Sequence, residues 1–279
     1  SKKTDMSFLS VIDMLIVDEV HKLRAGNKIN NIFKILKTNN RFGFTGTMPE
    51  KKEDQWNIIG KIGPILYEKN SFQLREEDYI APAKVYIIKI LYDNHRQYMY
   101  DGVEFDPTAK YRHELKMLQQ SVYRNNVISK VCGNIDNNAL ILVDYIEHGQ
   151  LLYNTLTLKL KHKKVYFIRG EVEVSERDKI KQLMEGTDDI ICIAISKIFS
   201  TGINIKNLHY IMFCAGGKAK VKIIQSIGRG LRQHKSKSML TIIDIADQLH
   251  YGKLHMHKRV KLYDEEKFEY KFQTLNCNE

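Results

Sequence analysis

The first residues in this chain that could do chemistry are an acidic pair at the end of a short apolar run. The run Met14–Val17 leads into Asp18 and Glu19, and His21 follows two residues later. In a parallel sheet the carboxyl ends of the strands open into the crevice where ligands bind. Asp18 is suited to hold Mg²⁺, through water because this ion dehydrates reluctantly. Glu19 is suited to orient and deprotonate an attacking water, and we predict that His21 senses the γ-phosphate of a nucleotide.

An acidic strand end that merely starts a loop would have the same residues. Stretches further along the chain therefore decide whether this one belongs to a nucleotide site. The first is Phe42–Thr47 (FGFTGT), a second apolar run that ends in a small polar turn. Thr45 and Thr47 in such a turn could hydrogen-bond the Asp-Glu strand end and couple the state of the nucleotide to motion. The alternative is a simple turn between a strand and a helix.

The next stretch, Ile198–Ile205 (IFSTGINI), has residues that suit a close approach to a phosphate. Thr201 and Gly202 let the backbone come near, because a glycine needs no room for a side chain. We expect Gly202 and Asn204 to border the nucleotide or the path of a nucleic-acid strand. The alternative is a loop whose glycine serves only a turn.

The last stretch, Gln225–His234 (QSIGRGLRQH), places basic side chains at helical spacing. Gln225, Arg229 and Arg232 are separated by four and three residues, so in a helix they share one face. Two arginines on one face could clamp a γ-phosphate and neutralise the charge that develops on the transferring phosphoryl group. The alternative is a basic helix face that is merely solvated.

The elements that must position these residues follow from short apolar runs that alternate with amphipathic stretches of helical length. This alternation is typical of βαβ units around a parallel sheet, so the predicted fold class is α/β. The predicted helices lie near residues 28–38, 111–131, 149–160, 175–185 and 218–232. The predicted strands are Met14–Asp18, Arg41–Thr45, Lys84–Leu91, Ala139–Asp144, Val165–Arg169, Ile190–Ile195, His209–Phe213 and Leu240–Asp244.

The length of 279 residues suggests two domains. The polar stretch Glu76–Ala83 contains a proline and is a plausible linker. We therefore predict domains at residues 1–80 and 81–250, followed by a helical tail at 251–279. Residues 93–110 are polar and turn-rich, and we expect them to form a surface insertion.

The composition favours a polyanionic partner. The chain has 44 basic and 33 acidic residues, a net charge of +11. Nucleic acid is the commonest partner of such a chain, because each neutralised phosphate releases counterions. The alternative is a surplus of solubilising lysine. The basic clusters that could contact phosphates are Lys159, Lys161, Lys163 and Lys164, then Lys218, Lys220 and Lys222, and finally Lys253, Lys258, Arg259 and Lys261.

Cysteines and apolar runs exclude other classes of protein. The four cysteines form no CxxC pair, which argues against a zinc ribbon or a thioredoxin-like site. The N-terminal residues show no signal-peptide pattern, and no apolar run reaches membrane-spanning length. We therefore expect a cytoplasmic protein with no membrane partner.

In order and spacing, these stretches resemble the motifs of superfamily 2 helicases. Asp18–His21, Thr45–Thr47, Ser200–Gly202 and Gln225–Arg232 match motifs II, III, V and VI, and residues 139–150 look like motif IV. Within the superfamily, the chain is similar to UvsW-type recombination helicases of tailed phages and more loosely to XPB-like DNA translocases. The stretches that carry this likeness are YRNNVISK, the His148-Gly149 pair, FSTGINIKNLHYI and EEKFEYKFQTL.

The resemblance implies two RecA-like domains that hold ATP and Mg²⁺ between them. It also implies movement, driven by ATP, on branched, forked or duplex DNA, as in branch migration, recombination and repair. The DNA backbone would be contacted by loops that in this chain contain His148, Gly170 and Thr201. Asn204 stands where many relatives have an acidic residue, which sets its nucleotide contact apart from theirs.

Other functions stay open on these motifs. An RNA helicase or the motor of a restriction enzyme would carry the same four core motifs. A non-catalytic nucleic-acid-binding remnant is a third alternative, although the retained Glu19, Arg229 and Arg232 argue against it.

The chain departs from the family at its phosphate-binding loop. A helicase of this type needs a GxxxxGK[ST] loop upstream of motif II, where backbone N–H groups and a lysine hold the phosphates. The first glycine of this chain is Gly26, which lies beyond motif II. We therefore expect a first domain truncated at its N-terminus and a chain that by itself hydrolyses ATP negligibly. The phosphate-binding segment would then act as a partner, in cis or in trans.

Overall fold

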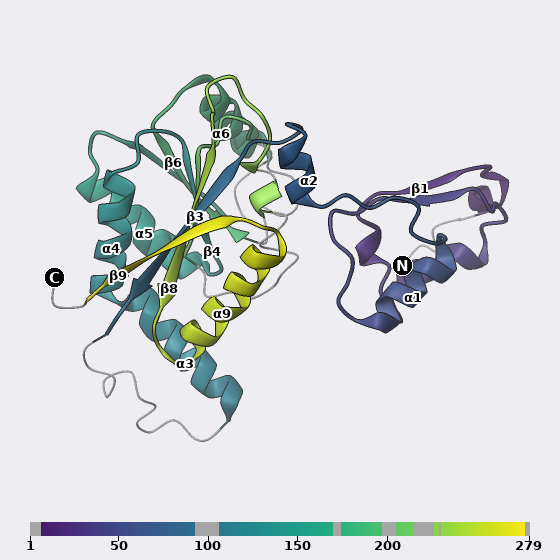
Figure 1. Cartoon of the computed structure of the whole chain (residues 1–279), viewed down its shortest axis with the longest axis horizontal. Coiled ribbons are helices and arrows are strands. Elements are labelled where there is room, and N and C mark those ends of the chain that lie inside the picture. The colour runs from purple at the N-terminus through teal and green to yellow at the C-terminus, as the bar shows by residue number, and fades with distance from the viewer. Residues whose placement is uncertain are drawn as a thin grey trace. The chain divides into compact units, whose positions relative to one another are not determined.

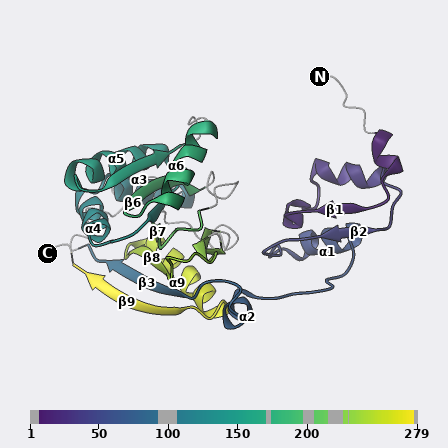
Figure 2. The same cartoon turned by 90° about the horizontal axis from the view of Figure 1, so that it is seen from above.

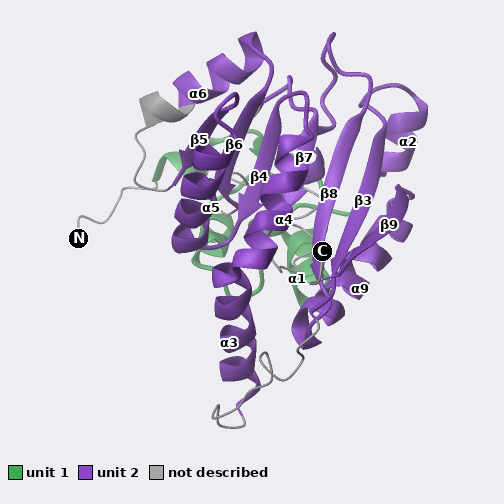
Figure 3. Cartoon of the chain, turned by 90° about the vertical axis from the view of Figure 1, so that its left-hand side faces the viewer, with its two compact units in different colours: residues 1–69 green, residues 70–279 purple. Residues whose placement is uncertain are grey.

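The chain folds into two compact units, which comprise residues 1–69 and 70–279 (Figure 3). The structure is a computed structural model that describes residues 7–92, 106–169, 174–196, 205–214, 226–228 and 230–276, without the side chains of 174–177. The division between the units lies before the predicted linker Glu76–Ala83.

Unit 1 is built on a small parallel sheet of two strands, β1 (Leu15–Val17) and β2 (Arg41–Gly43). Its small core contains Val20, Leu23 and Ile58. The predicted helix near 28–38 is a shorter 3-10 helix. The helices of this unit are η1 (Ser7–Val11), η2 (Val20–Lys22), η3 (Lys28–Lys34) and α1 (Lys52–Lys61).

One face of the unit 1 sheet is apolar and exposed. Ile16 and Phe42 pair across the two strands and are 63% and 42% exposed, and Phe44 beyond β2 is 60% exposed. The opposite face is covered, because a Cβ atom added at Gly43 would lie 3.0 Å from Cγ2 of Val20. Parallel sheets are normally buried on both faces, so the exposed face is a surface that needs cover.

Unit 2 is organised around one parallel sheet (Figure 1). Its strand order is β5-β6-β4-β7-β8-β3-β9 (Figure 3). All eight strands predicted from the sequence are present, two in unit 1 and six in unit 2, and the predicted α/β class is confirmed. The strands of unit 2 are β3 (Ala83–Ile90), β4 (Ala139–Val143), β5 (Lys164–Ile168), β6 (Ile190–Ile195), β7 (Tyr210–Phe213), β8 (Leu240–Asp247) and β9 (Glu269–Leu275).

Helices cover both faces of this sheet. One core contains Leu118, Ile128 and Leu156, from α3 (Pro107–Gln120), α4 (Val122–Gly133) and α5 (Ile146–Lys159). The other core contains Met184 and Leu262, from α6 (Val174–Gly186) and α9 (His250–Glu265). The central strands β4 and β6 are buried at every position, which is why they read as continuous apolar runs.

The predicted helix at 111–131 is in fact two helices that meet at Ser121. Asp106 caps the start of α3 by accepting the N–H of Thr108 at 3.0 Å, and Pro107 occupies the first helical position. Ser121 has extended backbone angles, and its hydroxyl accepts the N–H of Arg124 at 3.2 Å to start α4. Helical periodicity continues through this joint, which is why the sequence pattern concealed it.

The C-terminal residues are part of the sheet of unit 2, whereas the sequence predicted a helical tail. After α9 the chain turns at Lys267, whose φ of 50° ends the helix, and β9 then pairs in parallel with β3. Arg259 of α9 is 2% exposed and bonds the Asp244 carboxylate of β8 at 2.7 Å and 2.8 Å. Tyr263 donates its hydroxyl to the same carboxylate at 2.9 Å. These bonds fix α9 on the sheet, because a buried charge that lost its partner would be costly.

The short helix α2 (Ser71–Glu76), at the start of unit 2, rests on the turn between α9 and β9 (Figure 2). Arg75 donates to the carbonyl oxygens of Glu266 at 2.6 Å and Lys267 at 3.2 Å. Its guanidinium lies 4.2 Å from the centre of the Phe268 ring, a cation–π distance. The C-terminal segment therefore fixes the first helix of unit 2.

We predict that Arg259→Met lowers the free energy of unfolding by about 3–5 kcal/mol, because it leaves Asp244 as a buried carboxylate without its cation. Chemical unfolding followed by circular dichroism measures this change. Lys258→Met is the matched control, since Lys258 precedes Arg259 and is exposed. Equal losses in the two variants would contradict the role of the ion pair.

Candidate functional site

The residues predicted for chemistry in unit 1 meet at the carboxyl ends of β1 and β2. The two strands run parallel with Val17 opposite Gly43. Beyond them, Phe44 donates its N–H to the Val17 carbonyl and Val20 donates to the Phe44 carbonyl, both at 2.9 Å. These bonds hold the Asp-Glu turn beside the turn that contains Thr45 and Thr47.

A hydrogen-bond network connects the two turns. The Thr45 hydroxyl donates to the carbonyl oxygen of Thr47 at 2.9 Å, which uses its only proton. His21 Nδ1 lies 2.8 Å from the same hydroxyl oxygen and 3.1 Å from Glu19 Oε2. Both of these oxygens can only accept, so the proton of the His21 ring is placed on Nδ1. His21 thus joins the acidic turn to the threonine turn.

The protonation state of His21 follows from its burial. The ring is 6% exposed, and this burial lowers its pKa. Glu19 acts in the opposite direction and raises it, whereas Lys22 and Arg24 lower it further. The imidazole is therefore neutral at pH 7, with one donor and one acceptor nitrogen.

The backbone at Glu19 is in a conformation that side chains seldom adopt. Its φ of 53° and ψ of 47° are in the left-handed region, where a residue other than glycine is strained. The N–H of Glu19 also donates to Oδ1 of Asp18 at 2.7 Å. Together the turn and this bond set the direction of both carboxylates at the strand end.

Thr47 adds a further polar atom to this group. Its Oγ1 is buried and makes no hydrogen bond within the part of the chain that the structure describes. Buried hydroxyls normally have a hydrogen-bond partner, and an exception calls for an explanation, of which a catalytic role is one. Thr47 is therefore consistent with the predicted coupling role, which stays a prediction.

In unit 2 the structure places His148 in the interior. The sequence prediction made it a DNA contact, yet the residue is 3% exposed. Its Nε2 lies 3.4 Å from Arg124 Nη1 and 3.4 Å from the side-chain oxygen of Asn125. Burial, and then the Arg124 cation, lower the pKa of His148 to about 3, so it is neutral. In this structure the ring joins α5 to Arg124 and Asn125 of α4.

Arg124 is the centre of this interior group, and the sequence patterns did not single it out. It is 2% exposed, and its Nε bonds Asp247 of β8 at 2.9 Å. Its Nη2 donates to the carbonyl of Cys214, at the end of β7, at 2.8 Å, and Tyr92 donates its hydroxyl to Asp247 at 2.6 Å. One side chain therefore ties together α4, β7, β8 and α5. The signal in the sequence was the arginine in YRNNVISK together with the second aspartate of IIDIAD.

Gly149, next to His148, is required by packing. A Cβ atom there would lie 2.5 Å from the Phe167 ring of β5 and 3.3 Å from Val143 Cγ2. The His-Gly pair thus fits α5 closely against the sheet.

Six of the residues predicted for chemistry lie outside the described part of the chain, and their roles stay predictions. Arg232 is described. It is exposed and sits in a bend, since the helical residues 226–228 and 230 give way to a turn at Leu231. The prediction that Arg232 continues the face of a helix is therefore wrong for this residue. The six outside the described residues are Gly170, Thr201, Gly202, Asn204, Gln225 and Arg229.

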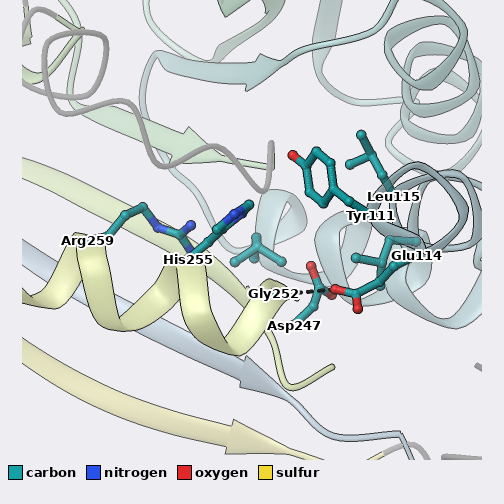
Figure 4. A pocket seen from close by; sticks show the side chains of 9 residues that line it. Tyr111, Glu114, Leu115, Asp247, Gly252, His255 and Arg259 are labelled. Carbon is teal, nitrogen blue, oxygen red and sulfur yellow. Dashed lines mark hydrogen bonds between the residues drawn. The ribbon is translucent and has the colours of Figure 1, made fainter. Parts of the chain in front are cut away.

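A small pocket lies between α3, β8 and α9 (Figure 4). Glu114 of α3 points toward the start of α9, where its carboxylate accepts the N–H groups of Tyr251 at 3.0 Å and Gly252 at 2.8 Å. A carboxylate is favourable there because the helix N-terminus carries partial positive charge. A Cβ atom on Gly252 would lie 2.4 Å from the Asp247 carbonyl oxygen. These groups join α3 to the C-terminal helix.

Two members of the predicted lysine and arginine clusters are engaged inside unit 2. Arg259 is the buried partner of Asp244, and Lys163 donates to Asp189 and to the Ile135 carbonyl. Neither is placed to contact a nucleic acid. Lys253, Lys258 and Lys261 of α9 are exposed, as are Lys159, Lys161 and Lys164.

Metal clusters and membrane spans are both absent from the residues that the structure describes. No group of histidine, cysteine, aspartate and glutamate there is arranged to hold a metal ion by itself. No helix in the same residues has both the length and the apolar character needed to cross a membrane.

Comparison with known families gives two matches. The model of the helicase conserved C-terminal domain matches residues 123–234. The model of the res subunit of type III restriction enzymes matches residues 2–50. The two matches thus cover the predicted motif II in unit 1 and the predicted motifs IV to VI in unit 2.

Curated relatives of the chain are also named helicases. The ATP-dependent DNA helicase uvsW of Enterobacteria phage T4 is 30% identical, over 98% of this chain and 57% of that protein. A DNA 3'-5' helicase XPB of Kineococcus radiotolerans is 24% identical, over 84% of this chain and 41% of that protein. The chain thus spans about half the length of the curated relatives it matches.

Solved structures share the fold. The crystal structure of T4 UvsW has a TM-score of 0.57 at 24% identity, over 99% of this chain and 56% of that chain. A fragment of a putative HsdR subunit of a type I restriction enzyme from Vibrio vulnificus has a TM-score of 0.67 at 15% identity, over 96% of this chain and 49% of that chain.

We predict that His148 makes unit 2 sensitive to acid. The folded pKa of about 3 lies below the usual value of 6.5, so the stabilising effect is complete above pH 6.5 and is lost as the pH falls. Between pH 6.5 and 5 the wild type should lose roughly 1.5 kcal/mol more than His148→Gln, which does not titrate. Unfolding by urea at several pH values measures the difference. Parallel curves for the two proteins would show that His148 is accessible to protons in the folded state.

Proposed function

We propose that this chain, which belongs to superfamily 2 of the helicases, is a portion of an ATP-driven DNA helicase or translocase that acts on branched or forked DNA. Two relatives that it resembles are named DNA helicases. The net charge of +11 suits a DNA partner. The chain spans about half of these relatives, so the activity belongs to the whole motor.

The observation that carries this proposal is the network at the carboxyl ends of β1 and β2. Glu19, His21 and Thr45 are connected by contacts of 3.1 Å and 2.8 Å. A strand end that served only as a turn would need neither a buried neutral histidine nor a glutamate in the left-handed region. The arrangement suits a carboxylate that must be held in one direction while it accepts a proton.

Each residue of the network has a proposed role. Glu19 orients the attacking water and accepts its proton. His21 holds Oε2 of Glu19 and passes a change there to the Thr45 hydroxyl, and through it to Thr47. Arg229 and Arg232 neutralise charge on the phosphates, with Gln225 beside them. Gly202, Asn204, Gly170 and Thr201 are proposed for the nucleotide and DNA contacts as the family motifs imply.

The carboxylate of Asp18 fits a Mg²⁺ ion that is held through water. It is exposed, and one of its oxygens accepts the Glu19 N–H, which fixes its direction without enclosing it. Such an open site with a single carboxylate is usual for Mg²⁺ that accompanies a nucleotide. Asp18 would hold such an ion through water, and the ion would supply positive charge against the phosphates.

We also propose that unit 1 packs against a segment that carries a phosphate-binding loop, in cis or in trans. The support is the exposed apolar face with Ile16, Phe42 and Phe44. Strands of a parallel sheet are stable when both faces are covered, and a sheet of two strands is marginal alone.

We predict that the 279-residue polypeptide alone hydrolyses ATP at a rate close to background, with or without forked DNA. A longer form that includes a GxxxxGK[ST] segment should hydrolyse ATP when DNA is added, because the loop then holds the phosphates. Glu19→Gln should lower that rate by roughly 10²-fold or more, since it removes the general base. A coupled assay of ADP release measures both. Forked DNA, duplex DNA and RNA are compared as activators.

The outcomes separate the alternatives. Activation by RNA alone would identify an RNA helicase. Turnover by the short polypeptide that depends on Glu19 would refute the need for the loop. A longer form that binds DNA but never hydrolyses ATP would identify a binding module instead of a motor.

We further predict that the exposed lysines of α9 contact DNA phosphates. Replacing Lys253, Lys258 and Lys261 by alanine should weaken binding to all DNA sequences and lower the salt slope by about one for each phosphate that is no longer neutralised. Fluorescence anisotropy at several salt concentrations measures this slope. A triple variant of Lys28, Lys51 and Lys52, exposed lysines of unit 1, is the control for an equal reduction of charge. If the two triple variants weakened DNA binding equally, the lysines of α9 would contribute only to the overall positive charge and would not contact phosphates.

A further inference from the structure

The end of the motif VI helix is held by an unusual set of donors. A helix leaves its last carbonyl groups without partners inside the helix, and these must be satisfied from elsewhere. Here the carbonyl of Leu231 accepts the N–H of Ala81, from the segment that leads into β3, at 2.7 Å. The carbonyl of Gly230 accepts the ammonium group of Lys237 at 2.6 Å. A lysine is well suited to this place, because the C-terminal end of a helix carries partial negative charge.

Lys237 makes a second bond, to the segment that follows motif V. Its ammonium group donates to the carbonyl oxygen of Lys206 at 3.0 Å. Lys206 is also fixed through its N–H, which donates to Glu185 of α6 at 2.5 Å. A single ammonium group therefore connects the backbone next to Arg229 with the backbone two residues after Asn204.

The surroundings leave the helix end little room to move. A Cβ atom on Gly230 would lie 2.6 Å from Ile211 Cδ1 of β7 and 2.9 Å from Leu240 Cδ2 of β8. The helix backbone therefore lies directly on the sheet at the residue whose carbonyl Lys237 holds. Gly230 directly follows the predicted Arg229 in the sequence.

Lys237 is costly to bury, which argues that its charge has a purpose. It is 6% exposed, and burial lowers its pKa to about 8, although Glu185 acts to raise it. At pH 7 it still carries its charge. An apolar side chain of similar length would fill the space without this desolvation, but it could not hold two carbonyl groups.

We propose that Lys237 is a positioning residue that holds motifs V and VI in a fixed relation, so that the predicted arginines act on the nucleotide from one defined position. This inference rests on the proposed function for its catalytic consequence. Its structural part, the connection through Lys237, rests on the hydrogen bonds from its ammonium group to Gly230 and Lys206 and stands apart from ATP hydrolysis.

The first experiment uses the 279-residue chain and needs no activity. Hydrogen–deuterium exchange, followed by mass spectrometry, reports on the peptides that contain residues 226–231 and 205–208. In Lys237→Met both peptides should exchange faster, while the strands β4 and β6 remain protected as in the wild type. Lys237→Arg, which keeps the charge and the donors, should restore protection. Lys235→Met is the matched control, since Lys235 is an exposed neighbour. Unchanged exchange in Lys237→Met would overturn the proposal.

The second experiment uses the longer form that hydrolyses ATP. Lys237→Met should lower kcat by roughly tenfold or more, because a small misplacement of a catalytic group has effects of this size. The KM for ATP and the affinity for DNA should stay within about twofold of the wild type, and Lys237→Arg should restore kcat. A parallel loss of kcat, ATP affinity and DNA affinity, or a failure of Lys237→Arg to restore kcat, would reduce Lys237 to a structural residue. If no form hydrolyses ATP, the proposed function fails, and the exchange experiment still decides the role of Lys237.

Discussion

Strand β8 carries two buried aspartates three residues apart, and a strand sends side chains at that spacing to opposite faces of the sheet. On one face Asp244 bonds Arg259 of α9, and on the other Asp247 bonds Arg124 of α4. Both arginines are 2% exposed. A buried ion pair adds little net stability, but loss of one partner is severe because the other charge remains buried. These two pairs therefore fix which helix lies on each face of unit 2.

The rest of unit 2 depends on those two positions. Arg124 also holds the Cys214 carbonyl and the His148 ring, so α4 is joined to the end of β7 and to α5. Arg259 keeps α9 on the sheet, and the turn after α9 receives Arg75 of α2. Two buried charges thus organise the helices that pack on the sheet of unit 2.

The candidate site of unit 1 differs, because it is held at a partly exposed edge by hydrogen bonds to carboxylates and to a threonine hydroxyl. His21 directs its Nδ1–H toward both Glu19 and Thr45, and burial lowers the pKa of the ring. The apolar face beside this site, with Ile16 and Phe42, is open. The site can therefore be assembled locally by two strands, while the stability of the unit depends on whatever covers that face.

The sequence by itself determined the class of fold and every strand except β9, because periodicity and short motifs depend on near neighbours in the chain. It also carried the order of motifs that identifies the family. Tertiary structure decided which charges are buried. In the sequence, Arg259 and His148 resemble surface residues. In the structure they are buried, because Asp244 bonds Arg259 and Arg124 contacts His148. Likewise, β9 forms a strand because it pairs with the edge of β3, which is distant in the sequence. The residues near β9 in the chain give no sign of that pairing.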